Sequence, residues 1–142
     1  MKKRDVKILI IVVAVMTLYG FGRGFLRAAL VPAGSEQAMR EVALELNRDL
    51  PKTLDAHTQL AFASGNDHLL SFHYKISRGV ADLETRSLAS ELRPKIVSET
   101  CGDRELYERF LAKSITVRHA FQDRDGIPIA SIDVTGADCP KP

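Results

Sequence analysis

Cys101 and Cys139 are the first candidates for chemistry in this 142-residue chain, and they are its two cysteines. Catalytic dithiols usually lie two residues apart at the start of a helix, whereas these two lie 38 positions apart. In an exported protein such a pair predicts one structural disulfide. The enclosed loop would stabilise the fold by roughly 4 kcal/mol in the chain-entropy model.

His57 and His73 are candidate metal ligands, with Asp55 as a third. Both histidines lie in alternating segments, and a turn at residues 65 and 66 would place them opposite each other on the polar face of a hairpin. A facing histidine pair can bind a transition metal. Two histidines also meet on neighbouring strands by chance, and no further His or Cys completes a site. We therefore predict no bound metal, no cofactor and no catalytic residue.

Asp123, Asp125 and Gly126 are spaced like the opening of a calcium loop. An EF-hand also needs Gly at its sixth position and Glu at its twelfth, and this chain meets neither requirement. The Asp-Gly pair is typical of a hairpin turn. The chain also lacks G-x-S-x-G, H-E-x-x-H, phosphate-loop and dinucleotide-binding motifs, which favours a protein that is not an enzyme.

An uncharged apolar stretch, residues 8–22, follows four basic residues among the first seven. This order is typical of export signals and anchors. As a helix, these residues span about 22 Å of a hydrocarbon core that is about 30 Å thick, and Arg23 and Arg27 could lengthen the span by reaching the outer interface. The residues that we expect in the membrane are Ile8, Ile11, Val15, Leu18 and Phe21.

Two interpretations of residues 1–33 remain open. An uncleaved signal anchor would cross the inner membrane once and place residues 34–142 in the periplasm as an α+β domain. A signal peptide cleaved near Val31-Pro32-Ala33 would release a soluble periplasmic protein. We favour the anchor because Arg23, Arg27 and Pro32 fit poorly in the final region of a cleaved signal.

The net charge of +2 hides two regions of opposite sign. Residues 34–142 contain 14 of the 20 basic residues and 17 of the 18 acidic residues, so their net charge is −3. A folded part with this charge has no electrostatic attraction to nucleic acid, and we expect no nucleic acid partner.

Four segments alternate apolar and polar residues as strands with one wet face do: 53–63, 69–76, 115–121 and 127–135. Leu60 and Phe62 should share the inward face of the first segment. His119 should be a partly buried histidine with its hydrogen bonds satisfied. A bulge near Pro128 would account for a change of phase in the last segment. Polar turns at 64–67 and 123–126 join the segments into two hairpins.

Apolar residues at helical spacing predict helices over 36–49, 83–96 and 103–113. Ser35 and Asp103 are suitable N-caps, and Pro94 predicts a kink or a division into two helices. The order of elements favours an α+β fold, in which a four-stranded antiparallel sheet of two hairpins is covered by helices on one face. The strand order stays open.

Several short features give residues 45–139 a resemblance to a loose class of small bacterial envelope proteins. They are Leu50-Pro51, Thr58, Phe72-His73-Tyr74, Cys101, Asp125-Gly126 and Asp138-Cys139. The resemblance implies an exported, disulfide-bridged α+β domain, and it implies no activity.

We therefore predict a non-enzymatic, membrane-tethered periplasmic protein that binds an envelope protein, as an accessory of envelope assembly or of a secretion system. One alternative is an immunity or inhibitor protein that neutralises a toxin in the periplasm. A metal-binding protein or a hydrolase that uses His57 and His73 is less favoured.

Overall fold

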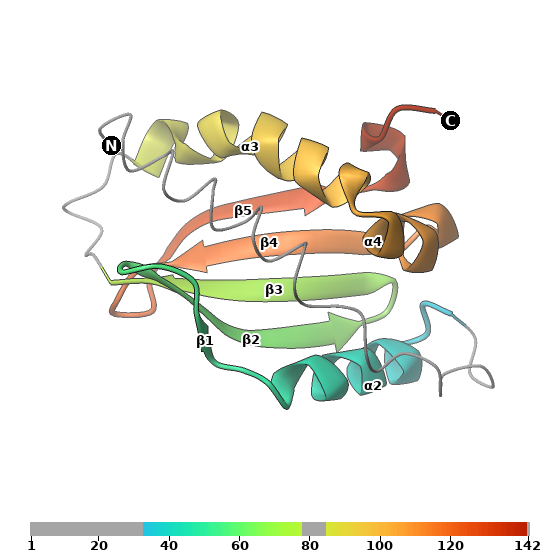
Figure 1. Cartoon of the computed structure of the whole chain (residues 1–142), viewed down its shortest axis with the longest axis horizontal. Coiled ribbons are helices and arrows are strands. Elements are labelled where there is room, and N and C mark those ends of the chain that lie inside the picture. The colour runs from blue at the N-terminus through green and yellow to red at the C-terminus, as the bar shows by residue number, and fades with distance from the viewer. Residues whose placement is uncertain (1–32, 78–84, 142) are drawn as a thin grey trace.

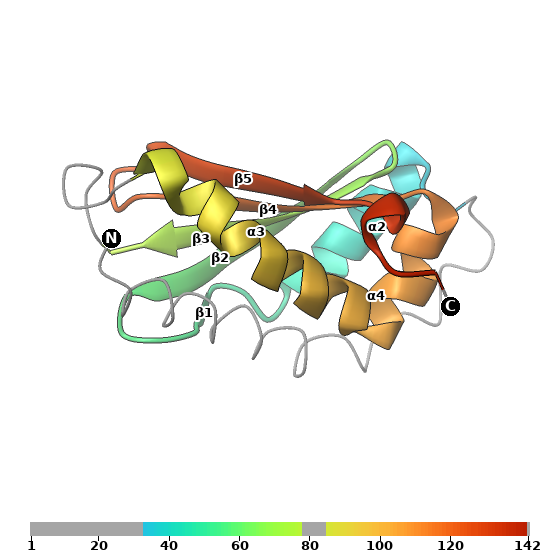
Figure 2. The same cartoon turned by 90° about the horizontal axis from the view of Figure 1, so that it is seen from above.

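The computed structural model describes residues 33–77 and 85–141, which form a five-stranded sheet with helices against one face (Figures 1 and 2). An α+β fold is therefore confirmed. The strands, in chain order, are β1 (Lys52–Thr53), β2 (Thr58–Asn66), β3 (Leu69–Ile76), β4 (Thr116–Gln122) and β5 (Pro128–Val134). They lie side by side in the same order.

The predicted four-stranded antiparallel sheet is wrong in two respects. Both hairpins form, β2 with β3 and β4 with β5, but β3 and β4 pair in parallel, so the sheet is mixed. Parallel neighbours need a long crossover connection, and the helical segment between β3 and β4 returns the chain to the end of the sheet where β3 began. The fifth strand, β1, pairs Lys52 with Leu60 and Thr53 with Gln59 at the edge of β2.

The first helix of the described residues, α2 (Glu36–Asn47), begins where the sequence predicts. The Ser35 side chain accepts a hydrogen bond from the backbone N–H of Ala38, which satisfies one of the free donors of the first turn. Met39, Val42 and Ala43 are buried against the sheet. This helix is therefore one of the helices that cover the sheet, as the sequence predicts.

The second helix, α3 (Thr85–Gly102), continues through Pro94 without dividing. Pro94 and Ser90, whose carbonyl loses its helical partner, are both exposed, so water can replace the missing hydrogen bond. The buried stripe of Leu88, Leu92 and Ile96 faces the core as predicted.

The predicted helix over 103–113 is divided. Asp103 caps α4 (Arg104–Arg109) by accepting from the N–H of Leu106, as expected. Phe110, with φ of −122°, ends α4, and a short 3-10 turn, η3 (Leu111–Lys113), follows. Phe110, at the point of division, is buried in the core.

One core lies between the sheet and the helices, with inward residues of β2 to β5 packed on α2, α3, α4 and η3. Within the described ranges, no helix is long and apolar enough to cross a membrane. The five residues that we expect in the membrane, from Ile8 to Phe21, lie outside the residues that the structure describes.

Candidate functional site

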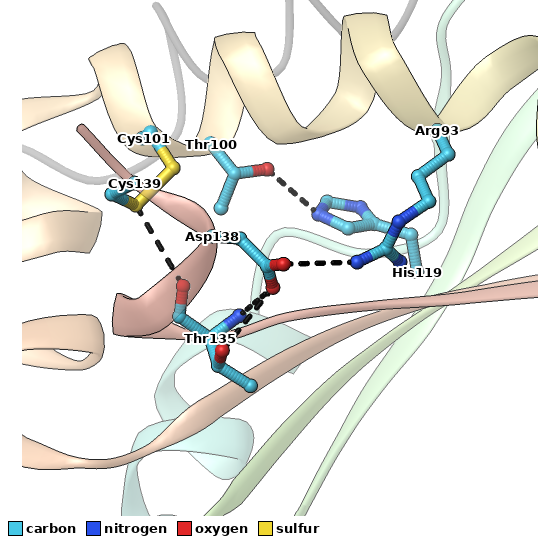
Figure 3. Close-up of a disulfide and its surroundings, with 7 residues drawn as sticks. All are labelled: Arg93, Thr100, Cys101, His119, Thr135, Asp138 and Cys139. Carbon is cyan, nitrogen blue, oxygen red and sulfur yellow. Dashed lines mark hydrogen bonds and ion pairs between the residues drawn. A yellow bond between two sulfur atoms is a disulfide. The ribbon is translucent and has the colours of Figure 1, made fainter.

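The predicted disulfide between Cys101 and Cys139 is present, with the Cα atoms 5.4 Å apart (Figure 3). Cys101 lies in the last turn of α3, and Cys139 directly follows a 3-10 turn, η4 (Gly136–Asp138). The bond therefore fastens the C-terminal segment, which leaves β5, to the helical layer.

Polar contacts reinforce this connection (Figure 3). The Asp138 carboxylate accepts hydrogen bonds from the backbone N–H and the hydroxyl of Thr135, at 2.8 and 3.2 Å. It also pairs with Arg93 of α3, at 3.0 Å, and Arg93 donates to the backbone carbonyl of Asp133 in β5. The Thr135 N–H is the main cause that lowers the pKa of Asp138. The arrangement supports the fold and presents no reactive group.

His119 lies inside the core, 2% exposed, and each ring nitrogen has a partner. Nδ1 lies 2.9 Å from the Tyr74 hydroxyl of β3, and Nε2 lies 3.2 Å from the Thr100 hydroxyl of α3. Burial lowers the pKa of His119 to about 4, so the ring is neutral at pH 7. The prediction of a satisfied histidine holds, although the side chain is fully rather than partly buried.

The predicted facing histidine pair does not form. His73 pairs with Phe62, whereas His57 precedes β2, and its Nδ1 lies 3.4 Å from the Ser77 hydroxyl. The carbonyl of His57 accepts from the backbone N–H of Ser77, four positions beyond His73, so at about 3.4 Å per residue the two histidines lie roughly 14 Å apart along the strands. Asp55 accepts a hydrogen bond from the backbone N–H of His57 rather than facing its ring. In residues 33–77 and 85–141, no three His, Cys, Asp or Glu side chains gather as metal ligands.

The Asp123–Gly126 segment forms the predicted hairpin turn. The buried Asp123 carboxylate accepts from the N–H groups of Asp125 and Ile127, both at 2.9 Å. Gly126 has φ of +82°, which favours glycine. A shift of register opposite Pro128 provides the predicted bulge.

A β-bulge in β2 places an aromatic ring on the open face of the sheet. The register between β2 and β3 shifts between Leu60 and Phe62, so that Leu60 stays in the core while Phe62 turns to the opposite face, 43% exposed. The buried inward position passes to Ala63. The prediction that Phe62 points inward is therefore wrong, because strict alternation does not continue through a bulge.

Phe62 stacks on His73, with ring centroids 4.1 Å apart and planes 9° apart. The Ser64 hydroxyl lies 2.8 Å from His73 Nε2, so the imidazole is held on two sides. Burial, with a smaller effect of the Arg118 charge, lowers the pKa of His73. The ring is therefore neutral at pH 7.

An ion pair lies beside these rings. Arg118 of β4 donates to both carboxylate oxygens of Asp133 of β5, at 2.7 and 3.0 Å. The hydrogen bond from Arg118 is the main cause that lowers the pKa of Asp133. We call Phe62, Ser64, His73, Arg118 and Asp133 the open-face patch, because they lie on the sheet face away from the helices.

Sequence reasoning singled out His73 as a candidate metal ligand, while predicting no bound metal, and expected Phe62 on the inward face. Ser64 was expected in a turn, Arg118 was expected only as a polar residue of an alternating strand, and Asp133 was given no role. Alternation alone places Arg118 on the wet face, but only the strand order shows that Asp133 lies opposite it. The patch combines an exposed aromatic ring, a fixed imidazole and a fixed guanidinium, which suit recognition of another protein surface.

No protein-family model matches this chain, and no curated protein matches its sequence. Similar folds occur among solved structures. A protein of Pseudomonas aeruginosa described as secreted has a TM-score of 0.65 and 17% identity, and the match covers 74% of this chain and 92% of that chain.

Two pilotins of type II secretion systems also match. EpsS of Vibrio vulnificus has a TM-score of 0.59 and 19% identity, with 75% of this chain and 93% of that chain covered. AspS of Vibrio cholerae has a TM-score of 0.51 and 15% identity, with 73% and 91% covered. At these identities the likeness establishes a shared fold.

Proposed function

We propose that this chain is a non-enzymatic envelope protein that binds another protein as an accessory of a secretion system. The observation that carries the proposal is the fold shared with two type II secretion pilotins, which spans more than nine tenths of each of them. The secreted Pseudomonas protein with the same fold agrees with a place outside the cytoplasm.

We further propose that residues 34–142 form a periplasmic domain tethered by residues 8–22 to the inner membrane. The Cys101–Cys139 bond supports an oxidising compartment. The basic residues that precede the apolar stretch favour an N-terminus in the cytoplasm. Cleavage near residue 33 would give a soluble periplasmic protein with the same binding function.

The open-face patch is the surface that we assign to binding. Phe62 offers an exposed ring that is already fixed by stacking, so little side-chain entropy is lost on contact. Lys75, two positions after His73 and on the same face, is exposed, whereas Arg118 and Asp133 neutralise each other. This face is thus net positive, although residues 34–142 carry −3. It fits a protein segment that brings an apolar side chain to Phe62 and a carboxylate to Lys75.

The test is site-specific photo-cross-linking in intact cells of the native organism. A benzoylphenylalanine residue replaces Phe62 in one strain and the exposed Leu44 of α2 in a second, and Ala112 of η3 serves as a matched exposed control. We expect one dominant adduct from position 62, weakened by Lys75→Glu and containing a component of a secretion system. With an uncleaved anchor, the adduct sediments with the membranes.

Each other outcome contradicts a defined part of the proposal. An adduct from position 44 alone would place binding on α2 and overturn the assignment of the open-face patch. An adduct with a secreted toxin would indicate that the chain inhibits a toxin and is not an accessory of a secretion system. Equal labelling from all three positions, or none from positions 44 and 62, would contradict a specific protein-binding function.

A further inference from the structure

His119 is the one place among the described residues where a ring that can take up a proton connects three elements inside the core. The ring belongs to β4, Tyr74 belongs to β3, and Thr100 belongs to the end of α3. All three side chains are at most 2% exposed. Thr100 directly precedes Cys101, so the contact lies at the disulfide-bearing end of α3 (Figure 3).

The hydrogen bonds suit a neutral ring. A neutral imidazole donates through one nitrogen and accepts through the other, and both hydroxyls can take the matching role. A protonated ring would donate through both nitrogens and would hold a positive charge without water, at a high desolvation cost.

The groups that face the ring do little to offset this cost. From β3 comes Tyr74, whose pKa burial raises, so it stays uncharged. The Asp133 carboxylate of β5 favours protonation of His119, but it lies on the opposite face of the sheet and is already engaged by Arg118. Thr100 of α3 is uncharged, and the Phe72 ring of β3 stacks against the His119 ring.

We propose that His119 is an acid-sensitive clasp that holds the disulfide-bearing end of α3 against the sheet and releases it when the ring is protonated. The sheet side of the contact is secured by the continuous backbone pairing of β3 with β4, from Leu69–Thr116 to Lys75–Gln122. The end of α3 is held on the sheet by side-chain contacts alone, so α3 is the element that moves.

The disulfide and the contacts of Arg93 limit the movement. The Cys101–Cys139 bond keeps α3 attached to the C-terminal segment, and Arg93 holds the middle of the helix to Asp133 and Asp138. Acid therefore opens the end of α3 locally before the sheet unfolds, which gives the periplasmic part a second conformation at low external pH.

Hydrogen exchange of the full-length chain in detergent micelles tests the clasp. The His119 ring changes its pKa from 6.5 when released to about 4 when held, so the opening constant rises about 30-fold between pH 8 and pH 5. We expect the amides of residues 96–102, after correction for intrinsic rates, to lose protection by about this factor. The amides of β4 should change much less.

His119→Gln should abolish the pH dependence, whereas His57→Asn, at an exposed histidine, should retain it. If His119→Gln does not fold, an NMR titration of the wild-type ring replaces it, and the midpoint must follow the loss of α3 protection. Equal loss of protection in α3 and β4, or pH dependence retained without His119, would overturn the proposal.

Discussion

Gly65 shows, at the scale of one residue, how closely α2 approaches the sheet. A Cβ atom at this position would lie 2.0 Å from the backbone oxygen of Met39 and 2.8 Å from the backbone nitrogen of Arg40. Both neighbours are backbone atoms of a helix, so no rotamer change can make room. The glycine is needed for space, because its φ lies outside the left-handed region.

Gly65→Ala should therefore destabilise the protein by about 1–3 kcal/mol, since the helix must move away from the sheet. Gly102→Ala is the matched control, because the added Cβ would meet nothing within 4 Å beyond its chain neighbours and its own helix backbone. Its effect should stay within about 0.5 kcal/mol. Urea unfolding of both variants measures the difference. Equal stabilities would show that α2 can shift at little cost.

At the scale of elements, Asn47 closes an edge of the sheet. Its side-chain amide donates to the carbonyl of Ala63 at 2.9 Å and accepts from the N–H of Ala63 at 2.7 Å. The short strand β1 pairs only with Gln59 and Leu60 of β2, so the last residue of α2 satisfies backbone groups that β1 does not reach. Edge strands without such cover invite pairing with other chains.

Asn47→Ala should lower the free energy of unfolding by about 1–3 kcal/mol, because Ala63 loses both partners at a part-buried edge. Asn47→Asp, which keeps only the acceptor, should fall between the wild type and Ala. Gln37→Ala removes an exposed side-chain hydrogen bond on the same helix and should change stability little. If Asn47→Ala lost no more stability than Gln37→Ala, water would be replacing the Asn47 amide at the backbone of Ala63.

The Cys101–Cys139 bond acts on the whole molecule, because it closes a loop that contains α4, η3, β4 and β5. The crossover between the parallel strands β3 and β4 is thus fixed covalently to the C-terminal segment at the end of α3. Loop closure lowers the entropy of the unfolded chain most for such long separations.

Replacing both cysteines by serine should lower the free energy of unfolding by about 4 kcal/mol, the chain-entropy value for this loop length. Dithiothreitol should lower the stability of the wild type by a similar amount and leave the double variant unchanged. Denaturant unfolding under oxidising and reducing conditions measures both. A double variant as stable as the wild type would mean that the unfolded chain is already confined.

Many features of the fold depend on residues that are close together in the sequence. Ser35 and Asp103 cap helices, and the Asp123–Gly126 turn closes through hydrogen bonds between residues at most four positions apart. Such contacts form with the same partners wherever the segment lies, so residue type and spacing predict them. With only two cysteines in the chain, the disulfide pairing was determined as well.

Tertiary structure alone decided the parallel pairing of β3 with β4, the exposure of Phe62 and the separation of His57 from His73. Each depends on the strand that lies alongside: a bulge exists only relative to a partner, and a one-residue shift moves a side chain to the other face. The sequence of β2 specifies its alternation, but the register against β3 determines that Phe62 and His73, rather than two histidines, meet on the open face.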